Sequence, residues 1–241
     1  MNSGRKSTPV EIRDRFDREV DRFANLETGQ TATMDAPLVL GLISDAAAAT
    51  TPHARRLLDV GCGAGNYTLQ VLRGLPNLEV DLVDLSPRML ERAAERVGAA
   101  TSNPVTTIQA DIRELEVEEG RYDLIVAAAV LHHLRTEAEW ESVFRKLHGA
   151  LRPGGSIWIS DLVEHAIPGA REVVWERYAE YLRGIGGTEY KEKVFGYIGM
   201  EDTPVPLSYQ LDLLRRSGFE KVDVLHKNGC FAAFGALKVA S

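Results

Sequence analysis

The chain has 241 residues, of which 44% are hydrophobic and 26% charged, so it fits one α/β domain with a large core, or a core domain with a small cap. The net charge of −7 argues against sequence-independent binding to long nucleic acid, which needs many Lys and Arg side chains against the phosphates. A small folded RNA, bound through a local basic patch, stays compatible with this charge.

Cysteine content and the N-terminal sequence favour a cytoplasmic location. Cys62 is expected in a loop and Cys230 at a hairpin turn, so we expect no disulfide and a cytoplasmic protein. Residues 1–9 are polar, lack the apolar centre of a signal peptide, and are predicted to be a short disordered tail. No apolar run approaches the roughly 18 residues of a membrane helix, so no membrane partner is expected.

Two amphipathic segments precede the core. Apolar residues at helical spacing predict a helix over 10–25, and a second helix is predicted over 35–49 with Pro37 in its first turn. We expect residues 10–52 to form a lid over a ligand site, because these helices have no other obvious partner. The side chains expected to face that site are Arg13, Phe16 and Met34.

Strands and helices alternate between residues 53 and 161. The predicted strands are 56–60, 78–83, 105–109, 122–127 and 156–160. The predicted helices are 66–74, 87–97 and 139–151, the last ended by Arg152-Pro153-Gly154-Gly155. This alternation predicts a doubly wound α/β fold with a parallel sheet and right-handed crossovers.

The alternation stops after residue 161. Residues 162–206 are helical in pattern and rich in aromatics, and we interpret them as a cap over the substrate. A last helix over 207–217 precedes two strands, 220–226 and 230–239, around the hairpin signal Asn228-Gly229. The aromatic residues that could wall the pocket are Trp175, Tyr178, Tyr181 and Tyr197; a core role or a homodimer face are the alternatives.

The first strand runs into the loop Gly61-Cys62-Gly63-Ala64-Gly65 before a helix. Glycines there let the backbone approach a ligand closely. The spacing G-x-G-x-G differs from the G-x-G-x-x-G that places a pyrophosphate on a helix N-terminus. The loop is therefore better suited to a ligand whose tail carries no phosphate, such as an amino acid.

Acidic residues follow the next two strands. Asp84 could accept hydrogen bonds from ribose hydroxyls, with Leu85 and Met89 packed on an adenine. Asp111 could accept a hydrogen bond from the adenine amino group, and Ile112 offers a backbone N–H. An acid after a strand is a helix cap or a turn residue as often as it is a ligand contact. These strand ends, however, converge on the edge where such sheets bind ligands.

Four segments carry a family resemblance. They are Leu57-Leu58-Asp59-Val60 with the glycine loop, Val83-Asp84-Leu85-Ser86, Tyr122-Asp123-Leu124-Ile125-Val126 running into Val130-Leu131-His132-His133-Leu134, and Leu151-Arg152-Pro153-Gly154-Gly155. Together they resemble the motifs of class I S-adenosylmethionine-dependent methyltransferases. The resemblance implies a seven-stranded sheet in the order 3-2-1-4-5-7-6, with the last strand antiparallel, as the hairpin signal also suggests.

The resemblance also implies roles for residues. Asp59, Gly61 and Gly63, with Cys62 between them, would line the methionine part of S-adenosylmethionine, and S-adenosylhomocysteine would be the product. Asp84 would bind the ribose, Asp111 and Ile112 the adenine, and Ala127 would lie near the sulfonium. Residues 127–130 read Ala-Ala-Ala-Val instead of Asn-Pro-Pro-Tyr, which disfavours methylation of planar amide or amine nitrogens.

His132, His133 and Asp161 follow the fourth and fifth strands and are the candidate catalytic residues. A helix-start or packing role for the histidines, and a turn role for Asp161, are the alternatives. Because neighbouring side chains diverge, we expect at most one histidine to face the site. We predict no metal site, since no third ligand lies at a sequence spacing typical of metal sites.

Three functions fit these features. The leading interpretation is methyl transfer to a small molecule. The second is tRNA wobble-uridine modification, by methyl transfer or by carboxy-S-adenosylmethionine synthesis, because the N-terminal helices and the helical insertion look somewhat like those enzymes. The synthase's arginine-bearing substrate motif is not clearly present, however. The third is a non-catalytic protein that binds S-adenosylmethionine for regulation.

Overall fold

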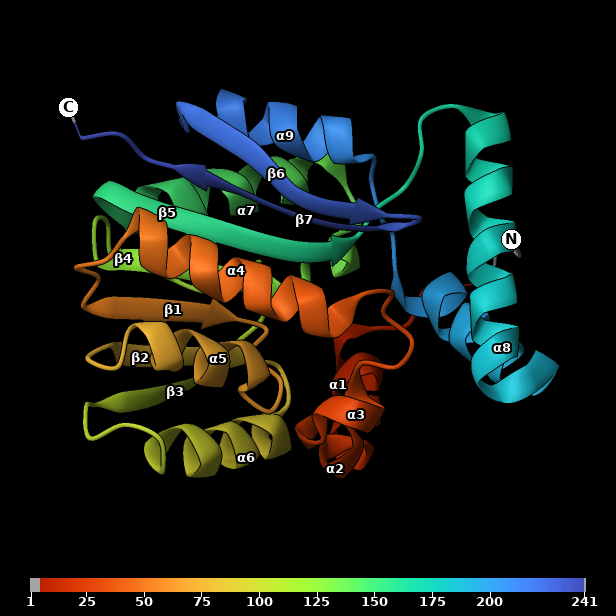
Figure 1. Ribbon diagram of the computed structural model, residues 1–241, viewed down its shortest axis with the longest axis horizontal. Coiled ribbons are helices and arrows are strands. Elements are labelled where there is room, and N and C mark those ends of the chain that lie inside the picture. Colours follow the sequence, from red (N-terminus) through yellow and green to blue (C-terminus); the bar gives the residue numbers. More distant parts are fainter. Residues whose placement is uncertain (1–4, 241) are drawn as a thin grey trace.

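The computed structural model describes residues 5–240, apart from the side chains of residues 26 and 27. A seven-stranded sheet runs through its centre in the order β3-β2-β1-β4-β5-β7-β6, as predicted (Figure 1). β7 is antiparallel to both its neighbours, and the other pairs are parallel. The strands are β1 (Arg56–Val60), β2 (Glu79–Asp84), β3 (Val105–Gln109), β4 (Tyr122–Ala128), β5 (Leu151–Leu162), β6 (Lys221–Asn228) and β7 (Phe231–Leu237).

Helices cover both faces of the sheet because its strands are apolar on both sides. Leu57 packs in a cluster with α4 (Ala36–Thr50), α5 (Asn66–Gly74) and α6 (Pro87–Gly98). The next residue, Leu58, points to the opposite face and packs in a cluster with α7 and α9. These two helices span Glu137–Ala150 and Leu207–Arg216. Figure 1 shows the two layers in front of and behind the sheet.

β5 is longer than the predicted strand 156–160 and begins earlier. The segment Arg152-Pro153-Gly154-Gly155 lies inside the strand, which begins at Leu151, and causes a register shift between the pairs Tyr122–Leu151 and Leu124–Ser156. Backbone hydrogen bonds join Gly154 N–H to the Lys238 carbonyl and Lys238 N–H to the Gly155 carbonyl. The chain after β7 therefore holds this Pro-Gly-Gly segment, in which Gly154 has φ +83°, as an irregular start of β5.

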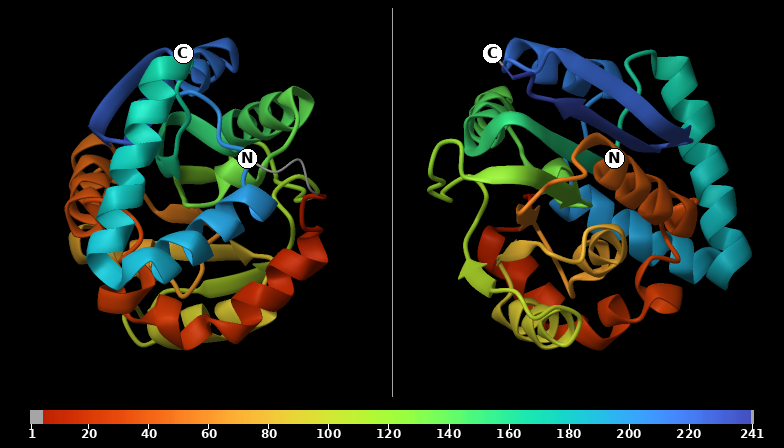
Figure 2. Two further views of the ribbon diagram at one scale, coloured as in Figure 1. Left: turned by 90° about the vertical axis from the view of Figure 1, so that its right-hand side faces the viewer. Right: turned by 60° about the vertical axis from the view of Figure 1, so that its left-hand side comes forward.

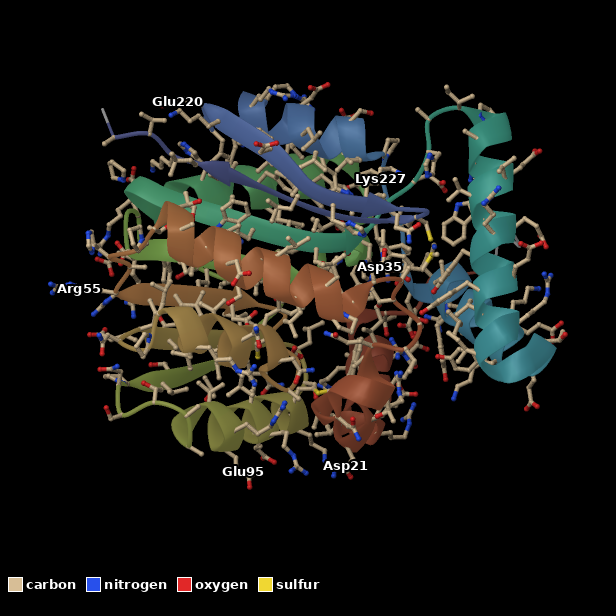
Figure 3. All side chains as sticks on the ribbon, in the orientation of Figure 1. Asp21, Asp35, Arg55, Glu95, Glu220 and Lys227 are labelled. Atoms are coloured by element: carbon tan, nitrogen blue, oxygen red, sulfur yellow. The ribbon has the colours of Figure 1, made fainter. Side chains whose placement is uncertain are left out.

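The hairpin forms one residue later than its sequence signal indicates. Asn228 pairs with Phe231, so Gly229 and Cys230 are the two central turn residues. The Asn228 side chain instead donates a hydrogen bond of 2.8 Å to Asp35, the residue before α4. Asp35 and Lys227 are labelled at this end of the molecule in Figure 3, away from Arg55 at the start of β1.

The predicted N-terminal helix is divided into short pieces. α1 (Pro9–Arg18) begins with a capping box in which the side chains of Thr8 and Glu11 satisfy each other's backbone N–H groups. It is followed by α2 (Val20–Ala24) and α3 (Leu26–Gly29). Residues 1–4 of the predicted tail lie outside the described residues, while Ser7 donates its backbone N–H to the Met200 carbonyl at 2.9 Å.

α8 (Pro168–Glu201) provides the helical insertion, with non-helical backbone at Gly186 and Gly187. Gly187 has φ +73°, a conformation that favours glycine and here bends the helix. Both views of Figure 2 place α8 and the N-terminal helices beside the end of the sheet to which the parallel strands point. Across residues 5–240, no helix is both long and apolar enough to cross a membrane.

Candidate functional site

The glycine loop lies directly after β1 and is held by Asp84. Gly61 has φ +67°, and a Cβ there would come within 2.6 Å of the Val130 side chain, so only glycine fits. The Asp84 carboxylate accepts a 2.8 Å hydrogen bond from the Gly63 backbone N–H and another from Ser86 N–H. Asp84 thus joins the loop after β1 to the end of β2.

Two of the predicted acids are costly to keep ionised. Asp59 is 1% exposed, and its carboxylate accepts a hydrogen bond of 2.6 Å from the Thr68 hydroxyl. Burial raises the pKa of Asp59 to about 7 and also raises the pKa of Asp84. Both carboxylates are therefore suited to a ligand that brings positive charge or hydrogen-bond donors.

Asp111 already has a partner. Its carboxylate accepts hydrogen bonds from the Arg113 guanidinium and backbone. Burial raises the pKa of Asp111, but these bonds to Arg113 outweigh it, and the net shift is downward. A ligand amino group would share Asp111 with this arginine.

These residues line one cavity of about 410 Å³, in the size range of small-molecule sites. Its walls come from the ends of β1, β2 and β4, from α1 to α3, and from the second half of α8. Most of the predicted residues line it: Phe16, Asp59, Gly61, Cys62, Gly63, Asp84, Leu85, Met89, Asp111, Ile112, His132, His133, Asp161, Tyr178 and Tyr197.

Five predicted residues do not line this cavity. Ala127 is fully buried within β4, and the following Ala128 and Ala129 reach the cavity instead. The other four have different neighbours. Arg13 pairs with Asp14, Trp175 donates to Glu164, Tyr181 donates to the Thr31 carbonyl, and Met34 packs in a cluster with Cys230.

Ala129 is a residue that sequence reasoning missed. It has φ +53°, which is uncommon for a residue with a Cβ, and it follows β4 directly. Its backbone N–H donates a 2.8 Å hydrogen bond to the Ser160 carbonyl, which holds the turn in place. Such backbone strain often occurs at functional sites.

His132 is held by the next strand. Its Nδ1 contacts the Asp161 carboxylate, whose other oxygen accepts the His132 backbone N–H at 3.0 Å. Burial lowers the pKa of His132, but the neighbouring carboxylates of Asp161 and Asp202 outweigh this effect and raise it to about 9. Asp161 therefore fixes the ring of His132 and is not a simple turn residue.

Both histidines face the cavity, so the expectation that their side chains diverge is wrong. The short 3₁₀ turn at Leu131–His133 brings their ring centroids to 4.4 Å from each other. Asp202 lies beside both rings, 3.2 Å from His133 Nδ1 and 3.6 Å from His132 Nε2. Pro206 is the N-cap of α9 and no side chain caps that helix, so Asp202 does not serve as its cap.

An ion pair joins the lid to the insertion. The Arg15 guanidinium in α1 donates two hydrogen bonds, of 2.8 and 2.5 Å, to the Glu201 carboxylate at the end of α8. Their side chains are 13% and 4% exposed. Phe16, the next residue of α1, lies edge-on to His133. α1 therefore lies against His133 of the histidine pair.

Comparisons with known proteins agree with this geometry. Residues 58–157 match a family described as a methyltransferase domain. The carboxy-S-adenosyl-L-methionine synthase of Chromohalobacter salexigens is 29% identical over 245 residues, covering 93% of this chain and 88% of that protein. The protein of the same name from Shewanella piezotolerans is 25% identical over 207 residues, covering 83% of each.

Solved structures share the fold at lower identity. The [4+2]-cyclase SpnF superposes with a TM-score of 0.67 at 15% identity, covering 99% of this chain and 98% of that one. The S-adenosylmethionine-dependent methyltransferase SibL gives a TM-score of 0.60 at 20% identity, covering 88% of this chain and 57% of that one. Because one of these proteins is named as a cyclase and the other as a methyltransferase, the fold alone does not identify a reaction.

Proposed function

We propose that this chain is a class I S-adenosylmethionine-dependent methyltransferase that transfers the methyl group of that cofactor to a small-molecule acceptor. The acceptor would bind in the same cavity, beside the histidine pair. The observation that carries this proposal is the cavity of about 410 Å³, which is lined by the strand ends together with α1 to α3 and α8. A cavity of this size suits a small molecule.

The cavity residues fit the cofactor. A Cβ at Gly63 would meet no atom within 4 Å, so the loop backbone faces space that a ligand can fill. We assign the ribose to Asp84 and the amino-acid tail to the loop and Asp59, whose pKa is raised by burial. When bound, S-adenosylmethionine supplies a methyl group on a positively charged sulfur.

The adenine is assigned to the neighbouring wall. Leu85, Met89 and Ile112 give that wall apolar surface, and Asp111 offers carboxylate oxygens at its edge. An adenine ring needs this combination of an apolar slot and a few hydrogen-bonding groups. His132, His133 and Asp161 lie on the far side of the glycine loop from β2 and β3, and we assign the acceptor to that part of the cavity.

Catalysis in this reaction needs mainly positioning. The acceptor atom forms a bond to the methyl carbon as the sulfur–carbon bond breaks and its electron pair stays on sulfur. The protein holds the two reactants in line and excludes water. A proton on the acceptor atom must also leave, and the histidine pair is the group nearest to that task.

Transfer of radioactivity from S-adenosyl-[methyl-³H]methionine tests the acceptor class. Protein would be incubated separately with a metabolite fraction below a few kilodaltons and with purified tRNA. We expect label in the small-molecule fraction, and loss of that label with Asp84→Ala protein. Label that enters only the tRNA would contradict the small-molecule assignment.

A second candidate is synthesis of carboxy-S-adenosylmethionine, which the names of the two bacterial relatives favour. In that reaction the cofactor itself is modified and becomes the product. Mass spectrometry of the cofactor after incubation with a small-molecule extract separates the two candidates. A cofactor heavier by one carboxyl group supports the second, whereas S-adenosylhomocysteine together with a methylated small molecule supports the first.

A further inference from the structure

Three ligand-type atoms converge at the acceptor side of the cavity, one each from His132, His133 and Asp202. They all lie within 4.8 Å of one another. We propose that they form a binding site for a divalent transition-metal ion, with zinc as the probe. The inference rests on the proposed function for the role of the metal, but the site itself is defined by these three residues alone.

The spacing of the atoms fits a tetrahedral metal ion, and His133 Nδ1 also lies 3.4 Å from the Glu201 carbonyl. The Asp202 carboxylate oxygen lies 3.6 Å from His132 Nε2 and 3.2 Å from His133 Nδ1. Ligands at about 2.1 Å from a tetrahedral zinc are about 3.4 Å apart, which falls between these two values. The longer distance exceeds that of a hydrogen bond, so the atoms converge without fully satisfying one another.

Asp161 prepares His132 for ligation. Its carboxylate contacts His132 Nδ1 and also accepts the backbone N–H groups of His132 and Leu162, at 3.0 and 2.9 Å. With a metal ion on Nε2, the Asp161 carboxylate would keep the remaining ring proton on Nδ1. This carboxylate–histidine arrangement is usual behind histidine ligands of metals.

The backbone also brings the ligands together. The Thr203 N–H donates a 2.6 Å hydrogen bond to the His132 carbonyl, so the end of α8 is tied to the turn after β4. His132 is 9% exposed, and the Asp202 side chain is 11% exposed. The three residues therefore form a rigid and largely dry site on the wall of the cavity.

Charge favours a cation here. Across residues 5–240, Glu201 is paired with Arg15 and Asp111 with Arg113, whereas no Lys or Arg side chain forms an ion pair with Asp202. The charge that compensates the Asp202 carboxylate therefore comes chiefly from the two histidine rings, and a metal ion held by the same atoms would take over that role. Two imidazoles and one carboxylate are a ligand set typical of zinc and of non-haem iron.

Three protein ligands leave at least one coordination position open toward the cavity. We assign it to a hydroxyl or enol oxygen of the acceptor. The metal lowers the pKa of a bound hydroxyl, whose proton leaves to solvent. The oxygen lone pair then forms the bond to the methyl carbon as the sulfur–carbon electron pair stays on sulfur. In this arrangement neither histidine acts as a base.

Calorimetry on the full chain, stripped with a chelator and without a histidine tag, tests the site. We expect one zinc ion to bind per chain, and Co²⁺ to give visible absorption bands at the same stoichiometry. Asp202→Asn and His133→Gln should each weaken zinc at least about tenfold, and Asp161→Asn roughly 10- to 100-fold. His53→Gln is the matched control and should bind normally, because His53 is exposed and precedes β1.

Two results would overturn the proposal: zinc that does not bind saturably, or zinc that binds equally well to Asp202→Asn, His133→Gln and the unchanged protein. Circular dichroism of each variant shows whether it is folded. If another variant is unfolded, zinc binding to the conservative Asp161→Asn variant gives a second readout. Binding of S-adenosylmethionine to the stripped protein is measured separately. If that binding persists while zinc fails, only the metal site is lost and the proposed function stands.

Discussion

At the scale of single residues, Asp59 combines burial with a position in the cofactor cavity. Its side chain lies under the glycine loop, with the Thr68 hydroxyl as a hydrogen-bond donor. The folded protein therefore holds a proton on Asp59 that the unfolded chain gives up above pH 4. A buried acid of this kind costs stability near neutral pH and is retained where it serves a ligand.

Replacing Asp59 by Asn should stabilise the protein at alkaline pH. The pKa of Asp59 is raised from 3.8 to about 7, so its contribution to the free energy of unfolding is full below pH 4 and is lost as pH rises through 7. The shift corresponds to at most about 4 kcal/mol at pH 8. Urea unfolding at pH 5 and pH 8 should show a gain for Asp59→Asn that grows with pH. An equal difference at both pH values would mean that Asp59 titrates normally.

Asp84 should matter for binding. Asp84→Ala removes the carboxylate that we assign to the ribose, and it also frees the Gly63 N–H from its partner. Loss of hydrogen bonds to a charged group costs about 1.5–3 kcal/mol each, so the dissociation constant for S-adenosylhomocysteine should rise at least about tenfold. Calorimetry measures this directly. An affinity equal to that of the unchanged protein would refute the ribose assignment.

At the scale of elements, the lid and the insertion were predicted as separate helical segments, but their contact was not. Arg15 and Glu201 are 186 residues apart and form a nearly buried ion pair. Nothing local in either segment indicates this pairing, because it depends on how α1 and α8 are placed by the sheet. At the kink of α8, a Cβ on Gly186 would come within 2.8 Å of the Tyr190 side chain, a close approach that the sequence does not reveal.

The Arg15–Glu201 pair should stabilise the closed lid. Arg15→Met leaves Glu201 buried without its main cationic partner, which should lower the free energy of unfolding by about 3 kcal/mol. It should also increase the rate at which S-adenosylhomocysteine dissociates, as measured by stopped-flow fluorescence. Arg13→Met is the control in the same helix, since the Arg13–Asp14 pair is 36% and 48% exposed and contributes less than about 1 kcal/mol. Equal effects of the two variants would contradict a role for the pair in closure.

At the scale of the whole molecule, the alternating strands and helices and most of the residues that line the cavity were predictable because their signals are local, whereas the sheet order was implied by the family resemblance. Strands, glycines and the acid after each strand lie within a few residues of one another, and parallel strands bring their ends to one edge. Asp202 was not predictable as a site residue, since it reaches His132 through a contact between segments 70 residues apart. Ala127 was misplaced by one position, because β4 extends to Ala128 and only the residues after Ala127 reach the cavity.

The most direct measurement of the central claim is thermal unfolding with S-adenosylmethionine and with S-adenosylhomocysteine. A ligand at 100 times its dissociation constant stabilises the native state by about 2.7 kcal/mol, which for a chain of this length is a shift of roughly 5–10 °C. We expect both compounds to raise the melting temperature of the full chain by this amount, and Asp84→Ala to abolish most of the shift. No shift with either compound at millimolar concentration would contradict the assignment of this cavity to the cofactor.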